Sequence, residues 1–177
     1  MINMGIAENL ARLRAEIPRH IKIVAVSKTM PAEVVQEAYN EGQRAFGENK
    51  VQELIEKHPL LPADTEWHMI GHLQTNKVKY IIPFISLIHS VDSLRLLSEI
   101  DKESGKCNRR TECLLQLRIA SEETKFGMSF ESALQLLNCE EYKKFRHIKI
   151  TGLMGMATYT DDRAQVKREF SDLKSYF

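Results

Sequence analysis

The sequence is poor in the features that define several large protein classes. Only three of its 177 residues are cysteine, and no two of them form a Cys-x-x-Cys pair. An odd number of widely spaced cysteines argues against a disulfide framework and favours a reducing, cytoplasmic setting. Apolar runs are too short to span a bilayer, so no membrane partner is expected. The first residues mix both charge signs and do not resemble a signal peptide.

An excess of charge of one sign is also missing. The 25 Lys and Arg residues nearly balance the 24 Asp and Glu residues, which leaves a formal net charge of +1. This balance gives no electrostatic reason to expect nucleic acid or an anionic membrane as a partner. Glycine fingerprints for nucleotides are absent as well, since residues 152–155 lack the third glycine of a dinucleotide loop. The length nevertheless suffices for a substantial core.

The sequence does contain alternating strand-like and helical segments. A charged amphipathic helix is expected at residues 4–16. Strands are then expected near 21–27, 44–48, 67–73, 86–91, 112–119 and 147–156, and helices near 31–41, 49–58, 76–83, 93–104, 129–140 and 162–176. Repeated strand–helix units predict a parallel α/β sheet with right-handed crossovers. Without a nucleotide fingerprint a (β/α) barrel is favoured, although a closed barrel needs eight strands and six are present.

Lys28 stands where the first strand ends and the chain enters a helix. In parallel α/β folds, reactive and binding groups collect at the carboxyl ends of the strands. A lysine there can lose its proton and form a Schiff base, because low-dielectric surroundings lower its pKa. The same position also suits a lysine that extends into water. This segment alone leaves both interpretations open.

Three other strand ends carry polar candidates. Glu48 and Asn49 could reach into a pocket at the top of a barrel, although Asn49 could also cap the following helix. Ser90, near the end of the fourth strand, is a further pocket candidate. Lys125 has the second-best position for a functional lysine, but it lies in a polar loop where a solvated charge is expected.

Two histidines and a glycine–methionine segment complete the candidates. His68 and His72 lie four residues apart, which is roughly 13 Å along a strand and too far for both to bind one metal ion. No metal site is therefore predicted, and each histidine either lines the pocket or is a hydrogen-bonded core residue. Met154 and its glycine neighbours, at the sixth strand end, would let a flat ligand approach the backbone or would simply pack in the core.

Taken together, these segments resemble a known family. The matching strings occur in the expected order and cover essentially the whole chain: AVSKT at 25–29, FGEN at 46–49 with VQE at 51–53, WHMIGHLQ at 67–74 with NK at 76–77, HSVDS at 89–93, KFG at 125–127 and GLM at 152–154. They resemble the pyridoxal phosphate homeostasis proteins, the single-domain relatives of the alanine racemase N-terminal barrel. Any one string is weak evidence, whereas six in order are specific.

The resemblance implies a modified TIM barrel that binds pyridoxal 5′-phosphate. Lys28 matches the Schiff-base lysine of the family, and Asn49 and Met154 match positions at or near the cofactor. With Ser90 from the strand-end analysis, these residues form the expected cofactor site. The family supplies and buffers the cofactor without established catalytic turnover. The expected partners are therefore the cofactor itself and apo forms of enzymes that use it, and the expected oligomeric state is a monomer.

One departure from the family pattern concerns the end of the sequence. The family continues past a helix like that at 165–177 with two further segments, which complete the barrel and bind the cofactor phosphate. Neither segment occurs in these residues. We therefore expect residues 1–177 to form one barrel domain that lacks its last two βα units, and we expect this form to bind the cofactor weakly or not at all.

Two alternatives to a cofactor carrier remain. The first is a fold-type III pyridoxal phosphate enzyme such as an amino-acid racemase. The resemblance implies that such enzymes oppose the lysine with a tyrosine from a second, β-rich domain, for which this chain has no room. Its five tyrosines fall in expected helices or loops. The second alternative is a non-catalytic interaction protein built on a decayed barrel. The carrier is favoured, and the protein is not expected to be an enzyme.

Overall fold

A parallel six-stranded sheet organises the chain. In this computed structural model, which describes residues 5–120 and 126–177, each strand pairs in parallel with the next strand in the sequence. The strands are β1 (Ala25–Val26), β2 (Ala45–Glu48), β3 (Glu66–Met69), β4 (Leu87–Val91), β5 (Thr111–Leu117) and β6 (Ile148–Gly155). Because neighbouring strands run parallel, every connection brings the chain from the carboxyl end of one strand back to the amino end of the next. The alternating sequence pattern predicts such connections.

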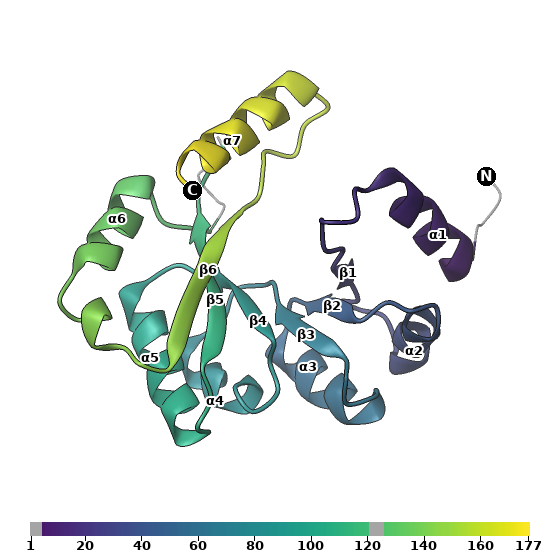
Figure 1. Cartoon of the computed structure of the whole chain (residues 1–177), viewed down its shortest axis with the longest axis horizontal. Helices are drawn as coiled ribbons and strands as arrows, with labels where there is room; N and C mark the ends of the chain where they lie inside the picture. Colours follow the sequence, from purple (N-terminus) through teal and green to yellow (C-terminus); the bar gives the residue numbers. More distant parts are fainter. Residues whose placement is uncertain (1–4, 121–125) are drawn as a thin grey trace.

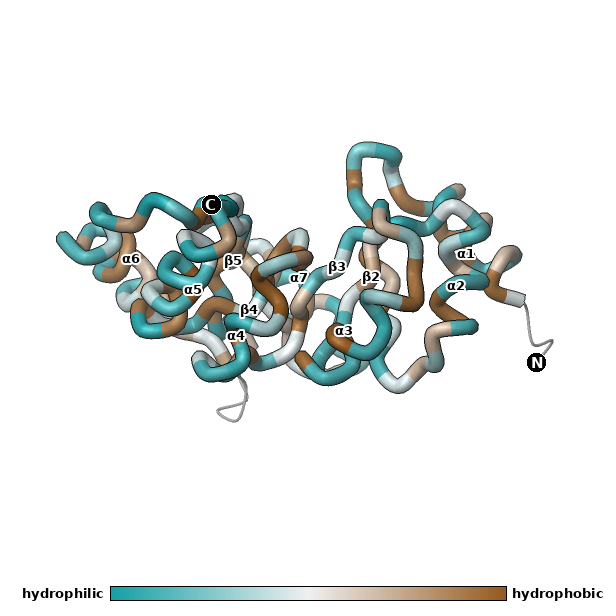
Figure 2. The backbone as a smooth tube through the Cα atoms, turned by 90° about the horizontal axis from the view of Figure 1, so that it is seen from below, coloured by the Kyte–Doolittle hydropathy of each residue, from teal (hydrophilic) through white to brown (hydrophobic). Residues whose placement is uncertain are grey.

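Helices occupy these connections, and one further helix lies before the first strand and one after the last. They are α1 (Ile6–Glu16), α2 (Ala32–Asn40), α3 (Val51–Lys57), α4 (Val78–Ile81), α5 (Leu94–Lys106), α6 (Phe130–Asn138) and α7 (Arg163–Ser175), with short 3₁₀ turns η1 (His58–Leu60), η2 (Thr75–Lys77) and η3 (Tyr142–Lys144). Figure 1 places α3, α4 and α5 along one side of the sheet. Figure 2 agrees with Figure 1 that α1 and α2 lie at one end of the arrangement and α6 at the other.

The two faces of the sheet differ in burial. Phe46, Trp67 and Ile88 are almost completely buried and belong to one core with the helix residues Leu54 and Leu97. Side chains alternate along a strand, so the intervening residues point to the opposite face, which we call the inner face. Val26 lies on that face and is 54% exposed. The core therefore lies between the strands and the helices, and the inner face is exposed at β1.

Helix ends follow the sequence signals closely. The side chains of Ser93, Ser129 and Asp162 accept hydrogen bonds from backbone N–H groups and cap α5, α6 and α7. Asn49 does not cap α3. The residue at that cap position is Lys50, which makes no side-chain cap hydrogen bond. The Asn49 amide is thus not used to end a helix.

Within the described residues the sheet is open, because β1 and β6 each pair with only one other strand. This agrees with the expectation of a barrel that lacks some of its units. β1 is much shorter than the predicted strand at 21–27. One cause is that the Gln43 side chain, instead of a backbone N–H, donates to the Ile23 carbonyl at 2.8 Å. Of the helices in the two described ranges, none is long and apolar enough to cross a membrane.

Candidate functional site

Lys28 lies inside a tight turn directly after β1. The Met30 N–H donates to the Ser27 carbonyl at 3.1 Å and closes the turn. Thr29 has a φ of +64°, as the third residue of a type II turn requires, and this is rare for a β-branched residue. The Lys28 side chain is exposed and makes no hydrogen bond or ion pair with the rest of the described chain. Its amine is therefore available.

A group of one serine and three charged residues supports this turn. We call it the Lys57 cluster (Ser27, Glu48, Glu53 and Lys57). The Lys57 Nζ donates to the Ser27 carbonyl at 2.9 Å and to Glu48 Oε1 at 2.7 Å. It also donates to Glu53 Oε2 at 2.9 Å, which in turn accepts from the Thr29 N–H at 2.8 Å. The residues on both sides of Lys28 are thus anchored to one lysine on α3.

The same cluster orients the side chains of Ser27 and Glu48. The Ser27 hydroxyl donates to Glu48 Oε1 at 2.7 Å, within a cluster that includes Lys57 on α3. Ser27 and Glu48 therefore point to the helix-covered side of the sheet. Lys28 itself is not part of this cluster, and its side chain is exposed. Glu48 was predicted to reach into a pocket at the top of the barrel, and that prediction is wrong because its carboxylate is bound to Lys57.

Burial and charge act in opposite directions within the Lys57 cluster. The side chains of Glu48 and Lys57 are 0% and 8% exposed. Burial raises the pKa of Glu48 more than its hydrogen bonds to Lys57 and Ser27 lower it. Burial alone would lower the pKa of Lys57, but the two carboxylates outweigh it and raise that pKa. The hydrogen bond from Lys57 lowers the pKa of Glu53. The cluster is therefore held together by charge, at the cost of desolvation.

Asn49 lies beside the segment that follows β3. A Cβ atom added to Gly71 would lie 2.7 Å from the Asn49 Cα, so only glycine allows this close approach. Asn49 and His72 share a cavity of about 350 Å³ with several polar neighbours, including Lys50 and Lys77. His72 also lies 3.6 Å from a carboxylate oxygen of Asp92. The carboxyl ends of β2 and β3 thus form a polar hollow.

Ser90 and Met154 lie one residue before the ends of β4 and β6. Ser90 is 1% exposed, and its hydroxyl has no hydrogen-bond partner among the described residues. Met154 is half-buried and pairs in register with Gln116 of β5. Together with Lys28 and Asn49, these residues belong to the carboxyl-end edge of the sheet. Lys28, Ser90 and Met154 do not line the cavity that contains Asn49, and Lys125 lies outside the described residues.

The inner face also carries a pair of histidines that the sequence did not link. His68 Nδ1 lies 2.8 Å from His89 Nε2, so one ring donates to the other. Burial lowers the pKa of His68, and burial lowers the pKa of His89 to about 4. His68 is therefore a hydrogen-bonded core histidine, one of its two predicted roles. β3 ends at Met69, so the extended strand assumed between His68 and His72 is absent.

The Lys57 cluster is the main functional feature that the sequence analysis missed. Two signals could have found it. Glu48 is a charged residue in an otherwise apolar strand, and Glu53 and Lys57 have the i, i+4 spacing of an ion pair on a helix. Cys113 on β5 is completely buried, and burial raises its pKa to about 12.

The parallel sheet, its helical crossovers and the lysine turn at the end of β1 define an α/β protein of the barrel class with a candidate ligand site at the carboxyl ends of its strands. Residues 4–176 match the family model for the alanine racemase N-terminal domain. Among curated proteins, the pyridoxal phosphate homeostasis protein of Helicobacter pylori is 40% identical over 172 residues, which cover 95% of this chain and 77% of that protein. The chain belongs to this family.

Solved structures give the same result. PipY of Synechococcus elongatus, solved with pyridoxal phosphate bound, is 34% identical and superposes with a TM-score of 0.88. That match covers 97% of this chain and 80% of the PipY chain. An alanine racemase of Clostridium difficile is only 16% identical, with a TM-score of 0.75 over 97% of this chain and 46% of that one. The racemase comparison therefore shows a shared fold alone.

Proposed function

We propose that this protein binds pyridoxal 5′-phosphate through Lys28 and carries or buffers the cofactor without catalytic turnover. The observation that carries the proposal is the free Lys28 amine at the carboxyl end of β1, in a turn whose two neighbouring residues are anchored to Lys57. The name of the H. pylori relative and the cofactor bound in PipY support it. A cytoplasmic location, a monomeric state and recipient apo-enzymes form part of the same proposal.

The residues present fit such a cofactor. When bound, it supplies an aldehyde that condenses reversibly with a primary amine, and the Lys28 amine has no partner among the described residues. The buried Ser90 hydroxyl lacks a hydrogen bond within the described chain, which is a costly state that a polar ligand can relieve. Asn49 provides an amide that caps no helix. Lys28 would hold the aldehyde end, Asn49 and Ser90 would donate hydrogen bonds, and Met154 would contact the ring.

A carrier role agrees better with these residues than a racemase role does. Binding and release need one amine, whereas racemisation needs a second proton-transfer group on the opposite face of the cofactor. Tyr39 is the tyrosine closest in sequence to Lys28, and its hydroxyl donates to Asp64, which precedes β3. Tyr39 is thus engaged at the amino end of the sheet and cannot serve as that group.

The proposal can be tested by competition with an apo-enzyme. Pyridoxal phosphate is mixed with an excess of this protein, and an apo-aminotransferase is then added. We expect reactivation to be slower than with the free cofactor at equal concentration, because Lys28 holds part of it. The Lys28→Ala variant should not slow reactivation, and Lys22→Ala should act like the unchanged protein. Equal slowing by Lys28→Ala, or interconversion of D- and L-alanine above the level of free cofactor, would contradict the proposal.

A further inference from the structure

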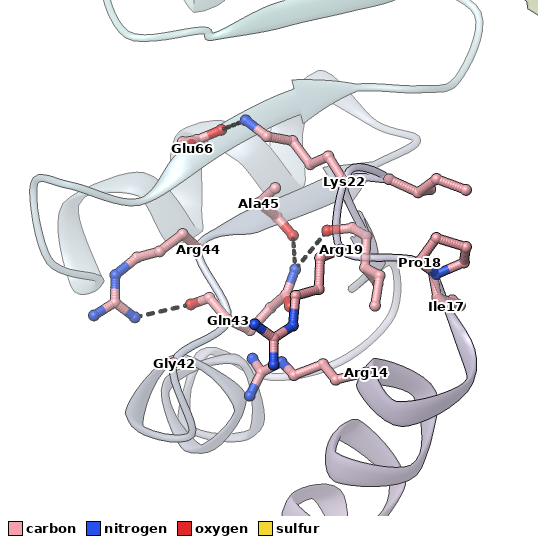
Figure 3. Close-up of a pocket in the computed structure, with 12 residues that line it drawn as sticks. Arg14, Ile17, Pro18, Arg19, Lys22, Gly42, Gln43, Arg44, Ala45 and Glu66 are labelled. Carbon is pink, nitrogen blue, oxygen red and sulfur yellow. Dashed lines mark hydrogen bonds and ion pairs between the residues drawn. The ribbon is translucent and has the colours of Figure 1, made fainter.

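A second cavity lies at the opposite end of the sheet from Lys28. It has a volume of about 470 Å³ and lies where β1 and β2 begin, next to the end of α1 (Figure 3). We call it the basic hollow, and its lining combines cationic, apolar and backbone groups: Arg14, Ile17, Pro18, Arg19, Ile21, Lys22, Ile23, Gly42, Gln43, Arg44, Ala45 and Glu66. In barrels this amino-terminal end usually serves stability, so a cavity with converging cations there calls for an explanation.

Two of the four cations in the basic hollow are already neutralised. Lys22 Nζ lies 2.5 Å from a carboxylate oxygen of Glu66, the only acidic residue in the lining. Arg44 Nε lies 2.9 Å from Asp64, and its guanidinium also lies over the Tyr39 ring at 3.9 Å from the centroid. These two side chains are therefore committed to the protein itself.

The other two cations have no carboxylate partner among the described residues. Arg14 Nη1 donates to the Glu41 carbonyl at 2.7 Å, so its charge faces only a backbone oxygen. Arg19 makes no hydrogen bond or ion pair within the described part of the chain. Figure 3 shows both guanidinium groups extending into the hollow from the end of α1 and the loop after it. Like charges that share a cavity repel each other, and an anion between them would remove this repulsion.

We propose that the basic hollow binds a small organic phosphate. The planar guanidinium group donates paired hydrogen bonds that match the geometry of a phosphate group, and two such groups converge here. Ile17, Pro18 and Ile21 supply an apolar wall for an organic body attached to that phosphate. The volume lies within the range of about 300–1,000 Å³ that is usual for small-molecule sites.

Hydrogen bonds of one buried side chain tie the floor of the basic hollow together. Gln43 is 5% exposed, and its amide nitrogen donates to the Ile23 carbonyl at 2.8 Å and to the Ala45 carbonyl at 2.7 Å. This residue ties the start of β2 to the segment that precedes β1. A recessed site on a protein of net charge +1 suits a small ligand better than nucleic acid, which needs an extended basic surface. The proposal does not depend on cofactor binding at Lys28.

The test is an NMR titration of the full chain labelled with ¹⁵N. Phenyl phosphate is added stepwise, and the chemical shifts of the backbone amides are recorded. We expect shifts in the backbone amides of residues 17, 19–23 and 42–45. Phenyl phosphate should bind more tightly than inorganic phosphate, because only the former has an apolar body. Arg19→Gln should weaken binding about tenfold, which is 1.4 kcal/mol. Arg12→Gln is the matched control, because Arg12 is exposed on α1 and does not line the hollow. It should leave binding unchanged.

Three outcomes would overturn the proposal. Equal weakening by Arg12→Gln and Arg19→Gln would show that only general charge attraction is measured. Binding of benzoate as tight as that of phenyl phosphate would reject the phosphate assignment. No shift of these amides up to about 10 mM phenyl phosphate would reject the site, since this corresponds to less than about 3 kcal/mol of binding. Arg19 makes no described contact, so a folding defect in Arg19→Gln is not expected, and thermal unfolding checks this.

Discussion

At the scale of single residues, the position of Lys28 depends on side chains that never approach its amine. Lys57 binds the carbonyl before Lys28, and Glu53 binds the N–H after it. Thr29 keeps a left-handed backbone conformation between these anchors. Such conformations cost of order 1–3 kcal/mol and persist only where the surroundings impose them. The Lys57 cluster therefore presents Lys28 in one defined turn.

Replacing Lys57 with methionine should destabilise the protein strongly. The change leaves the Glu48 carboxylate buried without a cation, and breaking a buried pair in this way costs about 3–5 kcal/mol. Lys79→Met is the matched control, because Lys79 is exposed on α4 and should change the free energy of unfolding by less than about 0.5 kcal/mol. Urea denaturation at pH 7 measures both. Similar stability of the two variants would show that the cluster does not support the turn.

At the scale of secondary structure elements, β3 and β4 are linked by their inner-face histidines. His68 and His89 share one hydrogen bond, and burial lowers the pKa of both. Unfolding returns each histidine to a pKa near 6.5, so the unfolded chain binds more protons than the folded one between about pH 4 and 6.5. Stability is therefore fully present above pH 6.5 and is lost as the pH falls toward 4.

This linkage gives a measurable pH dependence. Between pH 7.5 and pH 5 the free energy of unfolding should fall by about 2 kcal/mol through His89, whose pKa of about 4 is well below its unfolded value. His89→Gln should remove most of this fall. His20→Gln, at an exposed position in the loop after α1, should keep it. Urea denaturation at the two pH values measures the difference, and an unchanged fall in His89→Gln would contradict the role of the pair.

The elements themselves could be predicted well from the sequence, because the strands follow short apolar runs and several helices have polar signals at their ends. Ser93, Ser129 and Asp162 are examples, since local hydrogen bonds to the backbone decide where α5, α6 and α7 begin. The ends of the strands were predicted less accurately. β1 contains only Ala25–Val26, because pairing with a neighbour, which no local pattern encodes, decides which apolar residues join the ladder.

The candidate site was predictable only in part. Lys28 could be proposed because the carboxyl end of a parallel strand is known from local pattern alone. The direction of Glu48 could not, since it depends on Lys57 in the next helix and not on neighbours in the sequence. The pairing of His68 with His89 depends in the same way on strand register. The basic hollow combines residues from three separate segments, and for that reason no single motif indicated it.

At the scale of the whole molecule, the two candidate sites lie at opposite ends of one sheet. Lys28 follows β1 at the carboxyl end, and the basic hollow lies before β1 at the amino end. β1 therefore connects them, with its inner face exposed at Val26. The chain spans 77% of the H. pylori relative and 80% of the PipY chain. A reversible bond between Lys28 and the cofactor calls for a method that traps a transient complex.

The most direct test of the Lys28 assignment is reduction with borohydride in the presence of pyridoxal phosphate, followed by peptide mass mapping. Borohydride makes a reversible bond between the cofactor and a lysine permanent, so even a weak complex is recorded. We predict the added mass on the peptide that contains Lys28, no such mass in Lys28→Ala, and little on Lys22 or Lys50. Labelling spread evenly over exposed lysines, or retained elsewhere at full yield in Lys28→Ala, would contradict the account.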